Sequence, residues 1–92
     1  MIKPTVGRVV WYYPNGAVGW PQQFPGHEAE PMAAVIAFVH NDATINLHAI
    51  DPHGAASALD SVLLLQEGET KPAPGMGYAT WMPYQIEMAK KG

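Results

Sequence analysis

The hydrophobic positions of the chain fall into five short segments, each bounded by turn-forming residues. These segments cover residues 6–13, 32–40, 44–51, 59–66 and 78–82. They are rich in β-branched and aromatic residues, and short runs of this kind between Gly, Pro, Asn and Asp predict β-strands. Residues 83–90 follow with a proline at the first helical position and with Tyr84 and Met88 four residues apart. This pattern predicts a short terminal helix, which must dock on the sheet because so short a helix is marginal alone.

Two of the segments carry contrasting patterns. Residues 32–40 are apolar on both alternating faces, which is typical of a strand covered on both sides or of a buried helix. The flanking turns and the Val, Ile and Phe content favour the strand. Residues 44–51 alternate instead: Ile45, Leu47 and Ala49 face one way, and Thr44, Asn46 and His48 face the other. The residues 51–54 (Asp-Pro-His-Gly) then predict a tight turn.

Two long loops remain, at residues 15–31 and 67–77. The first contains Trp20 and Phe24, large aromatic residues that disordered linkers tend to lack, so we expect a folded loop over a pocket or an interface. Five strands, a long first loop, a tight hairpin and a closing helix predict one mainly β domain spanning residues 1–92. The architecture that fits best is a small five-stranded SH3-like barrel; an open β-sandwich and an α+β sheet with one helix are the alternatives.

The low charge of the chain predicts association. Of 92 residues, 48% are hydrophobic and 14% are charged, against about 25% charged in a typical domain. A surface with so few charges is expected to be partly covered by another copy of the chain or by a partner. The net charge is −3, and the five basic residues form no stripe, which argues against binding to long nucleic acid. A small anionic ligand stays compatible with them.

The chain contains no cysteine, and therefore no disulfide, thiol nucleophile or cysteine-type zinc site. Its longest apolar run has about eight residues, whereas a membrane span needs about 20. The first residues include no apolar stretch of signal-peptide length. These features predict a location in the cytoplasm of the cell that makes the protein, away from the membrane.

Enzyme and metal motifs are not found. The four histidines form no HxH or HExxH spacing, and the closest grouping is His48, Asp51 and His53 around a turn. Ser57 and Ser61 lack the GxSxG frame of an activated nucleophile. The glycines at 75 and 77 are too few for a phosphate-binding loop. We therefore expect neither catalysis nor a bound metal or cofactor.

The aromatic residues carry a stronger signal. Trp11 and Tyr13 share one face of their strand, and Tyr12 lies on the other face with Arg8. Three tryptophans and four tyrosines exceed what so small a core can bury fully, so some are expected to be half-exposed and suited to flat ligands such as purines. Core filling is the equal alternative for Trp11 and Trp81.

Three stretches carry a resemblance to known sequences. Residues 3–11 (KPTVGRVVW), 32–47 and 81–85 (WMPYQ) make the chain similar to a family of short bacteriophage and prophage proteins. The resemblance covers nearly the whole chain except residues 15–31, and its closing motif is its most specific part. It implies a phage origin but no assigned activity. Small phage proteins without enzyme motifs include virion parts, inhibitors of host proteins and counter-defence sponges, which sequester nucleotide-derived immune messengers in pockets between subunits.

The leading hypothesis is such a sponge, a homo-oligomer in the host cytoplasm that binds a cyclic dinucleotide or a cyclic ADP-ribose isomer. Aromatic side chains would stack the base, Arg8 or Lys3 would contact phosphate, and polar side chains would read the edges of the base. The candidate ligand-binding residues are Arg8, Trp11, Tyr13, Trp20, Asn46, His48, Trp81, Tyr84 and Gln85. The alternative hypothesis is an SH3-like structural or protein-interaction module of a phage, acting in virion assembly or on a host protein, with exposed aromatics at the interface.

Overall fold

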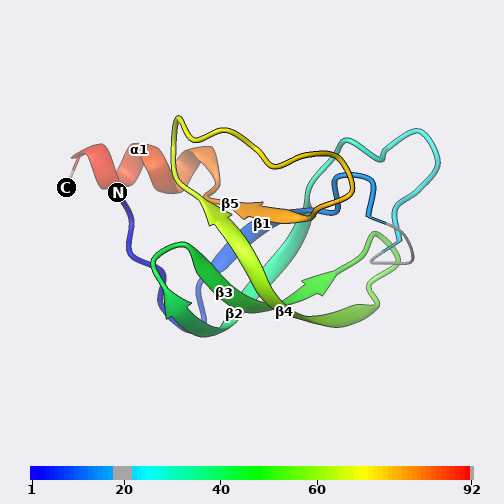
Figure 1. Ribbon diagram of the computed structural model, residues 1–92, viewed down its shortest axis with the longest axis horizontal. Coiled ribbons are helices and arrows are strands. Elements are labelled where there is room, and N and C mark those ends of the chain that lie inside the picture. The colour runs from blue at the N-terminus through cyan, green and yellow to red at the C-terminus, as the bar shows by residue number, and fades with distance from the viewer. Residues whose placement is uncertain (18–21, 92) are drawn as a thin grey trace.

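The computed structural model describes residues 1–17 and 22–91, and its strands close into a barrel. The elements are β1 (Val9–Tyr13), β2 (Met32–Asn41), β3 (Thr44–Ile50), β4 (Ala56–Leu65), β5 (Tyr78–Thr80) and α1 (Pro83–Lys91). Neighbouring strands pair antiparallel from β1 to β4, and β5 closes the barrel by pairing antiparallel with β1 and parallel with β4 (Figure 1). The predicted five-stranded SH3-like barrel with a C-terminal helix is confirmed. No described helix is long and apolar enough to cross a membrane.

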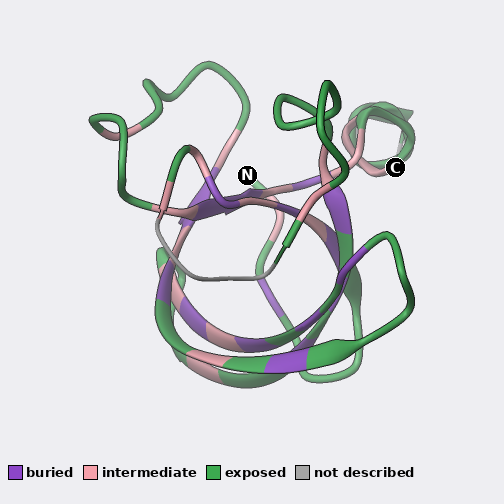
Figure 2. Cartoon of the chain, turned by 90° about the vertical axis from the view of Figure 1, so that its right-hand side faces the viewer, coloured by how far each residue is buried: buried purple, intermediate pink, exposed green. Residues whose placement is uncertain are grey.

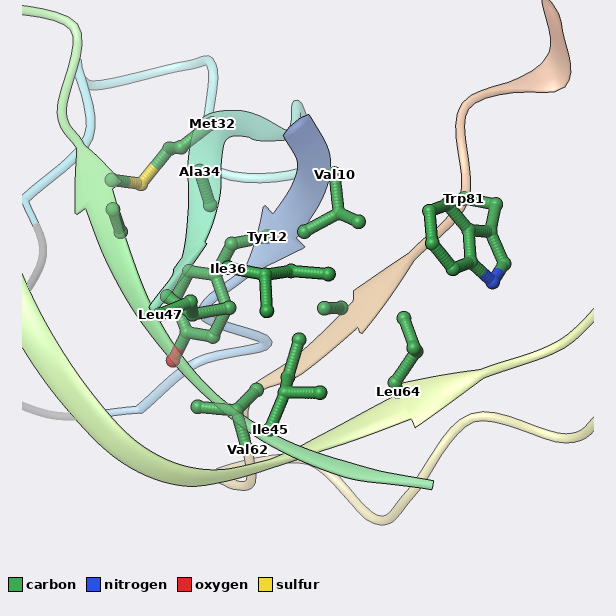
Figure 3. Close-up of a cluster of buried hydrophobic side chains, with 12 residues drawn as sticks. Val10, Tyr12, Met32, Ala34, Ile36, Ile45, Leu47, Val62, Leu64 and Trp81 are labelled. Carbon is green, nitrogen blue, oxygen red and sulfur yellow. The ribbon is translucent and has the colours of Figure 1, made fainter. Parts of the chain in front are cut away.

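The core fills the inside of the barrel with one alternating face from each strand (Figure 3). The residues Ile45, Leu47 and Ala49 of β3 are at most 2% exposed, as their alternation predicts. The other members are Val10, Tyr12, Met32, Ala34, Ile36, Val62, Leu64, Ala79 and Trp81. Outward residues alternate with them, so the closed barrel leaves one buried face and one outer face on every strand.

Register shifts bend the long strands so that the short barrel can close. One shift lies between Ile36 and Phe38 on β2, and another between Ile45 and Leu47 on β3, opposite β4. On β4, Ser61 has a left-handed φ of 54° and its N–H donates to Oδ1 of Asn46 at 2.8 Å. Bulges of this kind increase the local twist of a strand. The polar side chain of Asn46 therefore stabilises a bend in the barrel wall.

Two strands begin at residues other than those expected, and β5 ends at Thr80, two residues before its expected end. β1 begins three residues later, because Gly7 adopts a left-handed φ of 94° and a turn precedes Val9. β4 begins three residues earlier, at Ala56, although Ala56, Ser57 and Ala58 have little intrinsic preference for a strand. These three residues pair with His48–Ile50 of β3. Pairing with a neighbouring strand outweighs local preference here.

One side of the barrel is covered neither by the helix nor by the described parts of the long loops (Figures 1 and 2). Figures 1 and 2 show α1, residues 22–31 of the first long loop and the second long loop above the barrel, whereas the strands β2, β3 and β4 form its lower side. On the outer face of β2 and β3, Val35, Phe38 and Ile50 are 36%, 52% and 38% exposed. The expectation that residues 32–40 are covered on both sides is therefore wrong for the single chain. The apolar outer face of this strand is open to solvent.

Candidate functional site

A cavity of about 340 Å³ lies where β1 and β5 meet the two long loops. Tyr13 of β1 and Tyr78 and Thr80 of β5 contribute side chains from the barrel. Asn15, Glu28, Ala29 and Lys71 contribute from the loops. Cavities that bind small ligands have volumes of about 300–1,000 Å³, so this one, which we call the tyrosine pocket, has room for a small organic molecule.

The two tyrosines stand side by side because of the strand register. Tyr13 pairs with Tyr78 across β1 and β5, while Tyr12 and Ala79, one residue along each strand, point into the core. The rings of Tyr13 and Tyr78 stack with centroids 5.0 Å apart and an interplanar angle of 13°. Near-parallel aromatic pairs at this spacing attract each other beyond simple area burial. Tyr78 is only 8% exposed, so the half-buried ring of Tyr13 is the member of the pair that a ligand can reach.

The pKa of the Tyr13 hydroxyl is raised above its ordinary value. Burial is the largest influence that raises the pKa of Tyr13, and the charge of an ionised Tyr78 would raise it further. A hydrogen bond with the side chain of Thr80 lowers the pKa and offsets part of the increase. At physiological pH the phenol of Tyr13 is therefore neutral and able to donate a hydrogen bond.

Asn15 ties the two loops together at the rim of the pocket. Its Nδ2 donates to the carbonyl oxygens of Pro72, Ala73 and Met76 at 3.3, 3.1 and 3.0 Å. Its own carbonyl oxygen accepts from the N–H of Gly75 at 2.6 Å. Asn15 has a left-handed φ of 55°, which asparagine tolerates better than most residues. The loop before β5 is thus fastened to the end of β1.

Replacing Asn15 with alanine should loosen this loop. The change removes the side-chain hydrogen bonds and leaves alanine with a strained φ, so we expect a loss of about 2 kcal/mol in the free energy of unfolding. Hydrogen exchange should also accelerate in residues 71–77. The matched control is Asn41→Ala, which removes one turn hydrogen bond, to the N–H of Ala43, elsewhere in the chain. Equal exchange of residues 71–77 in both variants would contradict the role of Asn15.

The pocket carries one charge of each sign. Glu28 accepts a hydrogen bond from the N–H of Gly26 at 3.1 Å, and backbone hydrogen bonds lower the pKa of its carboxyl group. Its carboxylate is therefore ionised at neutral pH. Lys71 is exposed and forms no ion pair within residues 1–17 and 22–91. The loops thus place an anion and a cation beside the stacked rings.

Of the residues predicted to bind ligand, Tyr13 lines the tyrosine pocket and Trp11 lies next to it. Trp11 is half-buried on the outer face of β1 and pairs with Thr80, a pocket residue, across β5. The side chain of Trp20 lies outside the described residues. Tyr84, on α1, is 70% exposed, and His48 is exposed on the outer face of β3; neither lines the pocket.

Trp81 fills the core, the second of the two roles that its sequence allows. Its side chain is 2% exposed at the end of the barrel next to α1 (Figure 3). The guanidinium carbon of Arg8 lies 5.3 Å from the centroid of its ring, a cation–π contact. Burial removes Trp81 from the surfaces on which a base can stack, and Arg8 lies over the Trp81 ring and does not line the tyrosine pocket.

Two of the predicted polar residues have structural partners. The side-chain amide of Gln85 accepts from the N–H of Met82 at 2.8 Å and donates to the carbonyl of Val9 at 2.7 Å, which fastens α1 to β1. Oδ1 of Asn46 accepts from Ser61 and lies 2.9 Å from Nε2 of His40. Their hydrogen-bonding groups are used within the fold, so the structure does not support their assignment to a ligand.

The sequence pattern alone did not point to the remaining pocket residues. Tyr78 and Thr80 alternate around Ala79, a signal that they share the outer face of their strand. Their neighbour on that face is Tyr13 only because β5 pairs with β1, which no local pattern reveals. Glu28 and Lys71 are ordinary loop charges in the sequence, and barrel closure alone brings their loops to one place.

Two other cavities have linings that suit a nucleotide, with its flat base and anionic phosphate, less well than the tyrosine pocket does. A cavity of about 570 Å³ between the first residues and α1 is lined mainly by aliphatic and polar side chains, without an aromatic residue. A cavity of about 430 Å³ beside Phe24 contains Glu30 and Asp51 but no lysine or arginine. No group of three or more metal-ligating side chains is present within the described ranges. The tyrosine pocket combines an aromatic surface with a cation.

The comparisons with known proteins found no match, whether to a protein-family model, a curated protein or a solved structure.

Proposed function

We propose that this chain is a non-catalytic binding protein that sequesters a nucleotide-type ligand in the tyrosine pocket. The observation that carries the proposal is the stacked Tyr13–Tyr78 pair in a cavity that also contains a lysine. A base stacked on an aromatic side chain gains about 1–3 kcal/mol. Lys71 provides a charge-assisted contact for phosphate, and Thr80 offers a hydroxyl group for a ribose or a base edge.

In this proposal the pocket holds its ligand without converting it. Its described lining contains no histidine, serine or cysteine, and the proposal assigns Glu28, Lys71 and Thr80 to binding. The resemblance to short phage proteins suggests a biological setting for such retention. The proposed role is a counter-defence sponge that captures a cyclic dinucleotide or a cyclic ADP-ribose isomer in the host cytoplasm. The apolar outer face of β2 and β3 supports a homo-oligomer as the working form.

The proposal predicts ligand binding that depends on two pocket residues. Native mass spectrometry of the protein with cyclic di-GMP, cyclic di-AMP and cyclic ADP-ribose isomers should give a complex with an unaltered ligand mass, and the same spectra count the subunits. Calorimetry should then find binding weakened about tenfold or more by Tyr13→Leu and by Lys71→Ala.

The chain offers matched controls for both variants. Tyr84→Leu removes an exposed tyrosine from α1, and Lys91→Ala removes an exposed lysine from the same helix. Both control variants should bind like the unaltered protein. The proposal fails if no member of the panel is retained, if a retained ligand returns chemically changed, or if the pocket variants and the controls bind equally.

A second candidate function is an SH3-like protein-interaction module of a phage. It is favoured by Tyr84 and Met88, which are 70% and 52% exposed four residues apart on α1. Large exposed apolar side chains on one helix face are typical anchors of a protein interface. Under this function, purified virions or a host-protein complex would contain the chain, and Tyr84→Leu rather than Tyr13→Leu would abolish that association.

A further inference from the structure

Glu28 gives the tyrosine pocket a group that a simple phosphate site would avoid. Its carboxylate lines the same cavity as the stacked rings and Lys71, and the backbone hydrogen bond from Gly26 holds it in place. A carboxylate repels phosphate, so the phosphate of a bound nucleotide belongs beside Lys71. The base edge is then the part of the ligand that meets Glu28.

Resting on the proposed function, we propose that the pocket selects nucleotides with a guanine base. An ionised carboxylate only accepts hydrogen bonds, and its two oxygens accept best from two adjacent donors. Guanine presents such a pair, at N1–H and the N2 amino group. On the corresponding edges, adenine and cytosine each present one amino donor beside an acceptor nitrogen, and uracil presents one N–H between two carbonyls. Facing Glu28, each of these bases therefore turns an acceptor toward one of the carboxylate oxygens, and the two groups repel each other.

The stacked pair determines where that edge lies. Tyr78 is buried, so a base would stack on the half-buried ring of Tyr13, parallel to the pair. We expect its edges to face the two loops that complete the lining of the pocket. Glu28 comes from the first of those loops and Lys71 from the second, and Asn15 links the end of β1 to the second loop. A guanine nucleotide satisfies the anion with its base and the cation with its phosphate. The same arrangement explains why both charges are placed beside the rings.

Cyclic di-GMP and cyclic di-AMP provide the test, because their ribose-phosphate rings are identical and only the bases differ. Calorimetry on the full chain should find cyclic di-GMP bound at least about tenfold more tightly, the usual effect of a hydrogen bond to a charged group. Glu28→Gln should remove most of this preference, because its amide replaces one acceptor by a donor. Glu30→Gln, in the same loop but outside the pocket, should keep it.

The outcomes distinguish a failure of guanine selection from a failure of the proposed binding function. Equal binding of the two dinucleotides, tighter binding of cyclic di-AMP, or capture of cyclic ADP-ribose isomers alone overturns guanine selection and leaves the binding function intact. Preference retained in Glu28→Gln overturns the role of Glu28. Failure of every ligand to bind overturns both proposals. Circular dichroism of the Glu28→Gln variant verifies that the exposed substitution leaves the fold unchanged, and Glu28→Asp, which keeps the carboxylate, should retain part of the preference.

Discussion

Replacing Trp81 with alanine is expected to lower the free energy of unfolding by about 3–5 kcal/mol. The indole is 2% exposed and packs against the core at the end of the barrel where α1 begins. A domain of this size has a total stability of about 5–14 kcal/mol, so the loss removes a large part of it. Urea denaturation followed by circular dichroism measures the change without depending on the tryptophan signal.

Two further variants separate the core role of Trp81 from its contacts. Nε1 of Trp81 is buried without a hydrogen-bond partner within the described chain, and an unpaired buried donor costs about 1–3 kcal/mol. Trp81→Phe removes that donor along with some packing, so its net loss should be near 1 kcal/mol. Arg8→Ala removes only the cation–π contact and should cost at most about 1 kcal/mol. A loss below 1.5 kcal/mol in Trp81→Ala would contradict the core position.

The fold could be predicted largely because strand alternation is a local property. The alternation of residues 44–51 correctly identified Ile45, Leu47 and Ala49 as core residues. For residues 32–40 the predicted cover on both faces is wrong, because a hydrophobic pattern indicates that a face is apolar and not that anything lies against it. Val35 and Phe38 are exposed in the single chain. Two features lead us to expect a homo-oligomer. One is the apolar outer face of β2 and β3, and the other is the low share of charged residues in the chain.

The site was less predictable than the fold because it depends on non-local pairing. Tyr13 was recognised as an outward aromatic, but its partner Tyr78 lies 65 positions further along the chain and reaches it only through the β1–β5 ladder. Gln85 illustrates a different difficulty. A polar residue beside aromatics looks like a ligand contact, yet the fold uses both of its amide groups to dock α1. Hydrogen-bond capacity within the fold must be accounted for before a polar residue is assigned to a ligand.

Replacing Gly77 with alanine is expected to cost about 2–3 kcal/mol in the free energy of unfolding. A methyl group at this position would overlap the hydroxyl group of Tyr12 and lie 2.8 Å from the ring carbon that bears it. Tyr12 cannot move aside easily, because its ring is 4% exposed within the core of the barrel. The backbone before β5 must shift instead, and thermal or urea denaturation should detect the loss.

The double variant Gly77→Ala with Tyr12→Phe tests the physical cause. Removing the hydroxyl group relieves the closest contact but not the contact with the ring carbon, so part of the stability should return. Because Gly77 directly precedes Tyr78, the shift should also displace one member of the stacked pair and weaken ligand binding at the tyrosine pocket. Additive effects of the two substitutions would show that they do not interact, and the close approach of Tyr12 to Gly77 would then not be what excludes a side chain at position 77. Recovery of both stability and binding in the double variant would link barrel closure, the tyrosine pair and the ligand site through this one contact.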